Sequence, residues 1–372
     1  MSNEFKPMKF GCGRYVQAPG AIEIVGREAA MLKSKKALIV GGKQALDSVG
    51  AKMEESLKAA GVEPYFYTMT SDCTYETLGY LKDTLIPEQK FDLVIGSGGG
   101  KVVDMAKAAG KCSDLPVMNV PTSVATFNCW SAMSVMYTPD HKPIDRIWHS
   151  SEIDAVVIDT QVIANAPVKL FASGMADAFA KYIETGLMDE SYTVNNTPAG
   201  MYTSKVMAGT TNEIILNRGE KAYRDCVAHQ VTDDFDACVF ANVATTAIAA
   251  AVNYSNHSLI HSGNGKGATF AHALYYACKA KYTEETSQWL HGEIVGLGCQ
   301  ASMYAYERGE FETKNFARFM KAINQPMSLK DLGLGTTDKD LKELVDCMMV
   351  VWGKRPESHW QIIYDALQYI KD

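Results

Sequence analysis

The first half of the chain alternates short apolar runs with longer segments of helical periodicity. The apolar runs end in glycine, proline or polar residues and lack the in–out alternation of a half-exposed strand, which indicates strands covered on both faces. Strands separated by helices are typical of βαβ units and a mostly parallel sheet. The pattern predicts strands over 36–42, 64–68, 91–96, 116–120 and 155–159, and helices over 43–61, 75–86 and 101–110.

The second half of the chain has a different rhythm. Beyond about residue 166 it consists of long stretches rich in alanine and methionine, with few β-branched runs between them. Such stretches predict helices over 172–186, 198–216, 236–254 and 266–280. The segment Ala164–Pro167 interrupts the pattern, so we expect an α/β domain over 1–163 and an all-helical domain over 164–372. Two domains also suit the length of 372 residues, because single cores stop growing at roughly 250–300 residues.

Composition and charge narrow the class of protein. The chain carries 36 basic and 43 acidic residues, a formal net charge of −7, and it has no basic stripe that would suit nucleic acid. No continuous apolar run approaches the ~20 residues of a membrane span, and the N-terminus lacks the apolar core of a signal peptide. The nine cysteines are scattered, which is typical of a reduced, cytoplasmic enzyme.

A glycine-rich turn follows the third predicted strand and opens a helix at Lys101. In Gly96–Gly100, glycines let the backbone approach a ligand closely, and the helix beginning there offers free N–H groups suited to a phosphate. Pro121–Thr126 follows the fourth strand, so its hydroxyl and amide groups are expected at the same edge of the sheet. The alternative is a tight strand–helix turn that binds nothing. Asp104 and Lys107 are either a solvated i, i+3 pair or part of the phosphate end of this site.

Three polar residues lie on otherwise apolar helices of the second half. A carboxylate such as Asp177, among methionine, alanine and phenylalanine, is costly to bury without a partner. With His272 and His291 it would make a zinc-like site with one position open to substrate. Each histidine taken singly could instead be a core residue with satisfied hydrogen bonds. His257 and His261 are reserve ligands or substrate contacts, because they precede a glycine-rich stretch.

The segments 96–107, 121–126 and 131–137 resemble the cofactor-binding segments of the iron-containing alcohol dehydrogenase superfamily, in its glycerol dehydrogenase-like branch. The sequences around Asp177, His272 and His291 are similar to the three metal-binding segments of that branch. The resemblance runs from about residue 8 to the C-terminus, and the motifs keep their order and spacing. It implies a Rossmann-like domain followed by a helical domain, as in dehydroquinate synthase-like proteins.

The resemblance also implies ligands for a metal and a nicotinamide cofactor. Asp177, His272 and His291 would hold Zn²⁺, or Fe²⁺ or another divalent ion; the iron-dependent branch adds a histidine where this chain has Lys181. The implied reaction is hydride transfer between NAD or NADP and a small alcohol or its carbonyl partner. The implied cofactor contacts are Gly98, Gly99, Gly100, Lys101, Val102, Thr122, Ser123, Val124, Ala125, Ser131, Met133 and Tyr137, with Asp104 as a further candidate.

Two positions depart from the glycerol dehydrogenase pattern. Those enzymes have an aspartate that contacts the polyol where this chain has Phe127, and a phenyl ring accepts no such hydrogen bond. The segment around Phe127 and Trp130 resembles hydroxycarboxylate dehydrogenases of the same branch instead, which favours a 2-hydroxy acid; apolar packing is the alternative for both rings. NAD-specific members also place an aspartate after the first strand, where this chain has Gly42 and then Lys43. We therefore expect NADP to be accepted, unless this is simply a flexible turn.

Other functions remain open at this point. Glycerol dehydrogenase proper is the nearest alternative. A sugar-phosphate cyclase resembling 3-dehydroquinate synthase would need a basic cluster and a glutamate at position 177, and a non-catalytic sensor would bind the same ligands without turnover. Enzymes of this kind are usually homo-oligomers, and we expect a small-molecule substrate with no nucleic acid or membrane partner.

Overall fold

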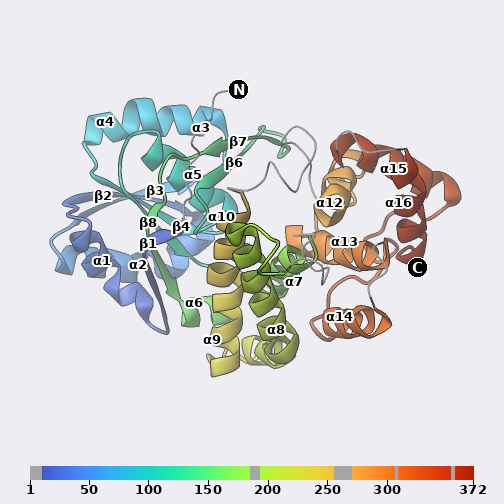
Figure 1. Ribbon diagram of the computed structural model, residues 1–372. Coiled ribbons are helices and arrows are strands. Elements are labelled where there is room, and N and C mark those ends of the chain that lie inside the picture. The colour runs from blue at the N-terminus through green and yellow to red at the C-terminus, as the bar shows by residue number, and fades with distance from the viewer. Residues whose placement is uncertain (1–10, 185–192, 255–269, 306–308, 353–356) are drawn as a thin grey trace. The chain divides into compact units, whose positions relative to one another are not determined.

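A computed structural model describes residues 11–184, 193–254, 270–305, 309–352 and 357–372 (Figure 1). The described chain forms two compact units. The sheet unit contains the residues up to Phe171 together with Asp225–Ala247, and the helical unit contains Ala172–Arg224 and Ile248–Asp372. Each compact unit is therefore made of separate segments of the chain. The boundary near residue 163, between a dinucleotide-binding domain and a helical metal-binding domain, stays a prediction. The predicted fold class, a parallel α/β part followed by a helical part, is confirmed.

The sheet unit is built on six parallel strands. Their order across the sheet is β1-β8-β5-β4-β2-β3, and a separate antiparallel pair is formed by β6 and β7. The strands are β1 (Cys12–Ala18), β2 (Lys36–Gly42), β3 (Glu63–Met69), β4 (Leu93–Gly98), β5 (Val117–Pro121), β6 (Met133–Tyr137), β7 (Pro143–Trp148) and β8 (Ile153–Asp159). All five predicted strands are present, and β1, β6 and β7 are additions to them.

Helices cover both faces of this sheet, as Figure 1 shows for α1 and α2 on one side and α3 to α5 on the other. Alternate residues of one strand enter different cores: Ile39 packs with Met53 and Leu57, and Leu38 packs with Leu81 and Met105. This explains why the strand sequences show no polar alternation. The helices of this unit are α1 (Val25–Met31), α2 (Lys43–Ala59), α3 (Tyr75–Tyr80), α4 (Ile86–Gln89), α5 (Gly100–Lys111), α6 (Thr160–Asn165) and α9 (Asp233–Phe240), with a 3₁₀ turn at Ala21–Ile24 and π turns at Leu81–Leu85 and Ala241–Thr245.

The order of the strands defines a switch point between β2 and β4. The chain leaves β2 through α2 and reaches β3 on one side, and it leaves β4 through α5 and reaches β5 on the other side. The connections after these adjacent strands therefore diverge, and ligands of open α/β sheets bind in the crevice at such a point. Gly42 ends β2, and Gly98–Gly100 lies at the end of β4 and the start of α5.

The helical unit packs around its own apolar core. Leu274, Leu297, Leu344 and Leu367, from four different helices, are fully buried in it. Its helices are α12 (Phe270–Lys281), α13 (His291–Ala305), α14 (Glu310–Ala322), α15 (Asp338–Trp352) and α16 (Ser358–Tyr369), together with most of α7 (Val168–Glu184), of α8 (Ala199–Val227) and of α10 (Thr246–Tyr254).

One helical run, Asp233–Val252, has the length and mean hydropathy (1.6) of a membrane span, although no span was predicted from the sequence. In the folded chain 72% of its apolar window is buried inside the protein. That burial is what a core helix requires, and the run begins with three acidic residues in its first turn.

Candidate metal centre and cofactor loop

Asp177 lies near the middle of α7 and is almost completely buried, with 4% of its surface exposed. Its neighbours along the helix, Met175, Ala176, Ala178 and Phe179, are buried as well. Burial by itself raises the pKa of Asp177, but His291, Lys181 and His272 hold that pKa at about 2. The carboxylate is therefore ionised at neutral pH in a place where an unpaired charge is costly.

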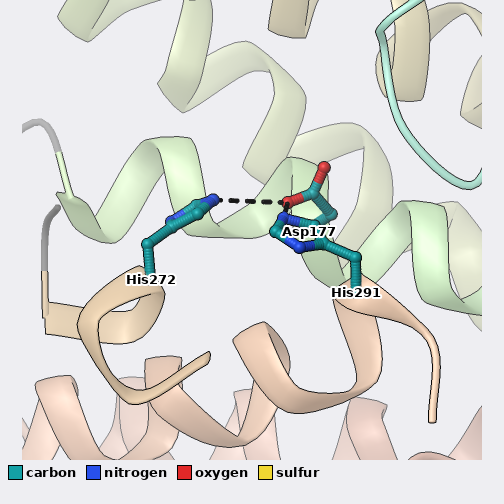
Figure 2. Close-up of side chains that lie close together, drawn as sticks. All are labelled: Asp177, His272 and His291. Atoms are coloured by element: carbon teal, nitrogen blue, oxygen red, sulfur yellow. Dashed lines mark ion pairs between the residues drawn. The ribbon is translucent and has the colours of Figure 1, made fainter. Parts of the chain in front are cut away.

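Two histidines from other helices meet this carboxylate (Figure 2). His272 lies in the first turn of α12, and His291 is the first residue of α13. The Nε2 atom of His291 is 3.3 Å from Asp177 Oδ1, and Nε2 of His272 is 3.8 Å from the same oxygen. One ligand atom from each residue lies within 4.8 Å of the other two, so the structure brings together all three residues that the sequence singled out.

The donor set fits a divalent metal. Within the described residues Asp177 Oδ1 is buried and has no hydrogen-bond partner of normal geometry, although both imidazoles approach it. A buried acceptor without a donor needs an explanation, and a cation shared with two imidazole nitrogens provides one. Three protein ligands of this kind leave a coordination position for substrate, as in catalytic zinc sites.

The sequence did not single out Glu184, which lies seven residues after Asp177 on α7. Its Oε2 is 2.7 Å from His272 Nδ1, and its Oε1 accepts a 3.0 Å hydrogen bond from the backbone N–H of His272. A spacing of seven residues places two side chains on the same helix face. This spacing is visible in the sequence, but a role for Glu184 can be recognised only once the structure places His272 beside it.

The glycine loop between β4 and α5 has the backbone geometry that its sequence predicts. Gly98 has a φ of 155°, and a Cβ there would lie 3.0 Å from the Val102 side chain. Gly99 precedes α5 in an extended conformation and, having no side chain, makes no cap hydrogen bond to this 12-residue helix. The uncapped helix start can receive an anion such as a phosphate.

The second predicted cofactor segment lies against this loop. The Thr122 N–H donates to the Gly98 carbonyl over 3.1 Å, and Ser123 Oγ lies 3.6 Å from the position of a Cβ on Gly99. Val124 is buried, and Asn242 Nδ2 donates to its carbonyl. Ala125 continues the same segment. The structure therefore brings the segments 98–102 and 122–125 together.

Lys101, at the start of α5, is held by Tyr137, which the sequence singled out, and by Asp72, which it did not. Its ammonium group lies 2.6 Å from Asp72 Oδ2 and 4.7 Å from the centre of the Tyr137 ring. His141 Nδ1 is 2.7 Å from the same Asp72 oxygen. Burial raises the pKa of Asp72, but its hydrogen bonds with Lys101 and His141 outweigh that effect and lower it.

Asp104 and Lys107 are not a solvated pair, so that alternative is wrong. Both side chains are buried, and Lys107 Nζ lies 2.7 Å from Asp104 Oδ1. The same ammonium donates to the carbonyls of Asn128 (2.7 Å), Ser131 (3.1 Å) and Met133. The buried pair therefore holds the segment 128–133 in place through hydrogen bonds. Asp104, Ser131 and Met133 take part in these contacts, and their contact with a cofactor stays a prediction.

Gly42 and Lys43 lie at the carboxyl end of β2, beside the switch point. Gly42 precedes α2 in an extended conformation, and a Cβ there would lie 3.6 Å from Val102 Cγ2. Lys43 Nζ is 2.7 Å from Asp47 Oδ2, and both side chains are mostly exposed. The predicted cofactor contacts of these residues are untested.

Phe127 and Trp130 are both buried, in agreement with their apolar character. The Trp130 ring packs 5.0 Å from the ring of Tyr15, and a Cβ on Gly11 would come within 2.7 Å of the indole. The indole N–H is buried and has no acceptor among the residues that the structure describes. His257 and His261, the reserve residues, lie outside the described residues.

Comparison with known proteins agrees with this fold. The family model for iron-containing alcohol dehydrogenase matches residues 12–160. A glycerol dehydrogenase from Thermotoga maritima is 28% identical over 90% of this chain and 87% of its own length. The solved structure of glycerol dehydrogenase from Schizosaccharomyces pombe superposes with a TM-score of 0.81 at 22% identity, covering 99% of this chain and 91% of its own. A probable glycerol dehydrogenase from Sinorhizobium meliloti gives a TM-score of 0.80 at 21% identity, covering 98% of each chain. The chain is therefore similar to iron-containing alcohol dehydrogenases over residues 12–160 and to glycerol dehydrogenases over most of its length.

Proposed function

We propose that this protein is a metal-dependent, nicotinamide-linked dehydrogenase that interconverts a small alcohol and its carbonyl partner, with a 2-hydroxy acid as the preferred alcohol. The observation that carries the proposal is the convergence of Asp177, His272 and His291 on one point of the helical unit. The same chain carries a glycine loop at the switch point of a parallel sheet, which suits a dinucleotide.

Zn²⁺ is the metal we favour, and Fe²⁺ or another divalent ion is the alternative. Two imidazole nitrogens and one carboxylate oxygen are a common ligand set for catalytic zinc. Position 181, where the iron-dependent branch has a histidine, is a lysine in this chain. A cation at this site supplies Lewis-acid chemistry at the substrate oxygen, and the nicotinamide supplies the redox chemistry.

The protein's own groups have defined tasks in this account. Asp177 is kept ionised by its neighbours and brings a negative charge to an otherwise apolar region. The two histidines present Nε2 toward it. The backbone N–H groups at the start of α5 receive the cofactor diphosphate, and the glycines before them leave room for it.

The substrate preference rests on Phe127 and Trp130. Phe127 provides no acceptor for a polyol hydroxyl, and the buried indole N–H of Trp130 is a donor that lacks an acceptor within the described residues. A carboxylate of a 2-oxo acid can accept such a hydrogen bond, whereas an aspartate at position 127 would repel it. Glycerol dehydrogenase activity is the second candidate, favoured by the name of the Thermotoga maritima relative.

The Trp130→Phe substitution tests this preference. It keeps an aromatic ring against Tyr15 and removes the N–H. A hydrogen bond to a charged group is worth about 1.5–3 kcal/mol, so KM for 2-oxobutyrate should rise roughly 10- to 150-fold. Steady-state kinetics with dihydroxyacetone provide the comparison, and its KM should change little. An equal change for both substrates would assign Trp130 a packing role only.

NADP acceptance rests on Gly42 and Lys43. Neither residue repels a 2′-phosphate, and among the described residues Lys43 is paired with Asp47 alone, in an exposed i, i+4 contact. Such a contact is worth about 0.3–0.5 kcal/mol, so a phosphate can compete for the ammonium group. Lys43→Asp should raise KM for NADPH far more than KM for NADH.

The experiment that tests the proposed reaction is a panel of initial rates with the zinc-loaded protein. NADPH and NADH are each supplied with 2-oxobutyrate and with dihydroxyacetone. We expect the fastest oxidation with the 2-oxo acid and measurable use of NADPH. Oxidation with dihydroxyacetone alone would move the protein to the glycerol dehydrogenase class. Our proposal also includes a cytoplasmic location and a homo-oligomeric state. Light scattering of the purified chain would measure the oligomeric state.

A further inference from the structure

Glu184 makes two hydrogen bonds to one residue of the candidate metal centre. Its Oε2 is 2.7 Å from Nδ1 of His272, and its Oε1 accepts from the backbone N–H of His272 over 3.0 Å. The Glu184 side chain is only 5% exposed, so water screens these contacts weakly. The residue therefore contacts both the imidazole of His272 and the backbone that carries it.

The first contact selects a tautomer of the imidazole. An ionised carboxylate only accepts hydrogen bonds, so the proton must lie on Nδ1. The lone pair of the neutral ring is then on Nε2, which is the atom that faces Asp177 Oδ1 at 3.8 Å. This is the tautomer in which His272 can coordinate a cation shared with Asp177.

The second contact fixes the backbone. His272 is the third residue of α12, and N–H groups in the first turn of a helix have no partner within the helix. Glu184 satisfies one of them from the last residue of α7, the helix that also carries Asp177. The carboxylate thus links the end of α7 to the start of α12 and sets the direction of the imidazole.

We infer that Glu184 is a positioning residue for the metal, acting through His272 and determining how tightly the cation is held. This inference rests on the proposed function, because it assumes that Asp177, His272 and His291 bind a metal. Carboxylates that orient a histidine ligand typically change metal affinity 10- to 100-fold when they are altered.

The test is zinc affinity of the whole chain, measured by competition with a chromogenic chelator, for the wild type and Glu184→Gln. The amide has one oxygen where the carboxylate has two, so it can fill only one of the two acceptor positions that face Nδ1 and the backbone N–H. If its NH₂ group faces Nδ1, the proton moves to Nε2 and blocks the lone pair. We expect zinc binding to weaken about 10- to 100-fold. Glu310→Gln, an exposed residue on α14, is the matched control and should leave the affinity unchanged.

Two further measurements separate positioning from loss of fold. Thermal unfolding of the metal-free proteins should give similar midpoints for the wild type and Glu184→Gln. Nitrogen-15 NMR of the metal-free wild type should find the His272 proton on Nδ1, and this result needs no variant. Wild-type affinity retained in Glu184→Gln, or a proton on Nε2 of His272 in the wild type, would overturn the inference alone. A wild-type chain that binds no divalent ion would overturn the proposed metal centre as well.

Discussion

At the scale of single residues, the buried pair Asp104–Lys107 shows how strongly the sheet unit depends on one buried lysine side chain. Lys107 is fully buried and is surrounded by a carboxylate and by the carbonyls of Asn128, Ser131 and Met133. Replacing it would leave the Asp104 charge without its cation and the segment 128–133 without its donor. Removing one partner of a buried ion pair costs about 3–5 kcal/mol.

We therefore predict that Lys107→Met lowers the free energy of unfolding by about 3–5 kcal/mol. Urea denaturation followed by circular dichroism gives this value. Lys58→Met removes an exposed lysine that pairs with Glu54, and it should change stability by less than about 0.5 kcal/mol. Equal free energies of unfolding for the two variants would show that Lys107 does not stabilise the fold in this way.

The sequence could predict the identity of the candidate ligands better than their surroundings. Asp177, His272 and His291 stood out because each is polar on an apolar helix, which is a local property. The burial of Lys107 was not predictable in the same way, because an i, i+3 acid–base pair looks alike on a solvated face and in a core. Glu184 and Asp72 were missed because their partners are distant in sequence: 88 residues separate Glu184 from His272, and 69 separate Asp72 from His141.

At the scale of elements, the approach of α13 to α7 places His291 beside Asp177. The residue after His291 is Gly292, and a Cβ there would lie 1.9 Å from the Ser173 backbone oxygen on α7. The Gly292 N–H also donates to Ser173 Oγ over 3.1 Å. The two helices can be this close only because position 292 has no side chain.

Gly292→Ala should therefore separate the two helices and lower both stability and zinc affinity. Overpacking of this kind costs about 1–3 kcal/mol or more, and displacement of His291 should weaken metal binding at least tenfold. Gly209→Ala in α8 is the matched control: a Cβ there meets nothing within 4 Å, so alanine should be neutral or stabilise by up to ~1 kcal/mol. Thermal melts and zinc titrations of the two variants measure both effects. Equal melting temperatures and equal zinc affinities for the two variants would contradict this explanation.

The elements were predictable where their periodicity was strong. Five strands were found because each is a short, continuous apolar or aromatic run. Four of them (β2, β4, β5 and β8) are buried, whereas the edge strand β3 is mostly exposed or half-buried. β1 was missed because Cys12–Ala18 is an edge strand with polar residues and intermediate burial. The hairpin of β6 and β7 was missed because β7 is mostly exposed and lacks an apolar face.

At the scale of the whole molecule, the two sites lie in different compact units. The glycine loop and the segment 121–137 belong to the sheet unit, and Asp177, His272 and His291 belong to the helical unit. The return of Asp225–Ala247 to the sheet unit could not be predicted, because a helical pattern identifies an apolar face but not its partner. The family model for iron-containing alcohol dehydrogenase matches residues 12–160, which include the glycine loop but not Asp177, His272 or His291.

The central claim is that this chain transfers hydride between a nicotinamide cofactor and a small carbonyl compound only when its metal site is filled. The most direct test follows NADPH oxidation with 2-oxobutyrate in chelator-treated and zinc-restored protein, with His272→Ala in parallel, and quantifies the hydroxy acid formed. We predict one NADPH consumed per hydroxy acid, no turnover after chelation, recovery with zinc in the wild type and none in His272→Ala. Full turnover in the chelated protein or in His272→Ala would contradict the metal assignment, and binding of cofactor without net oxidation would contradict the dehydrogenase assignment.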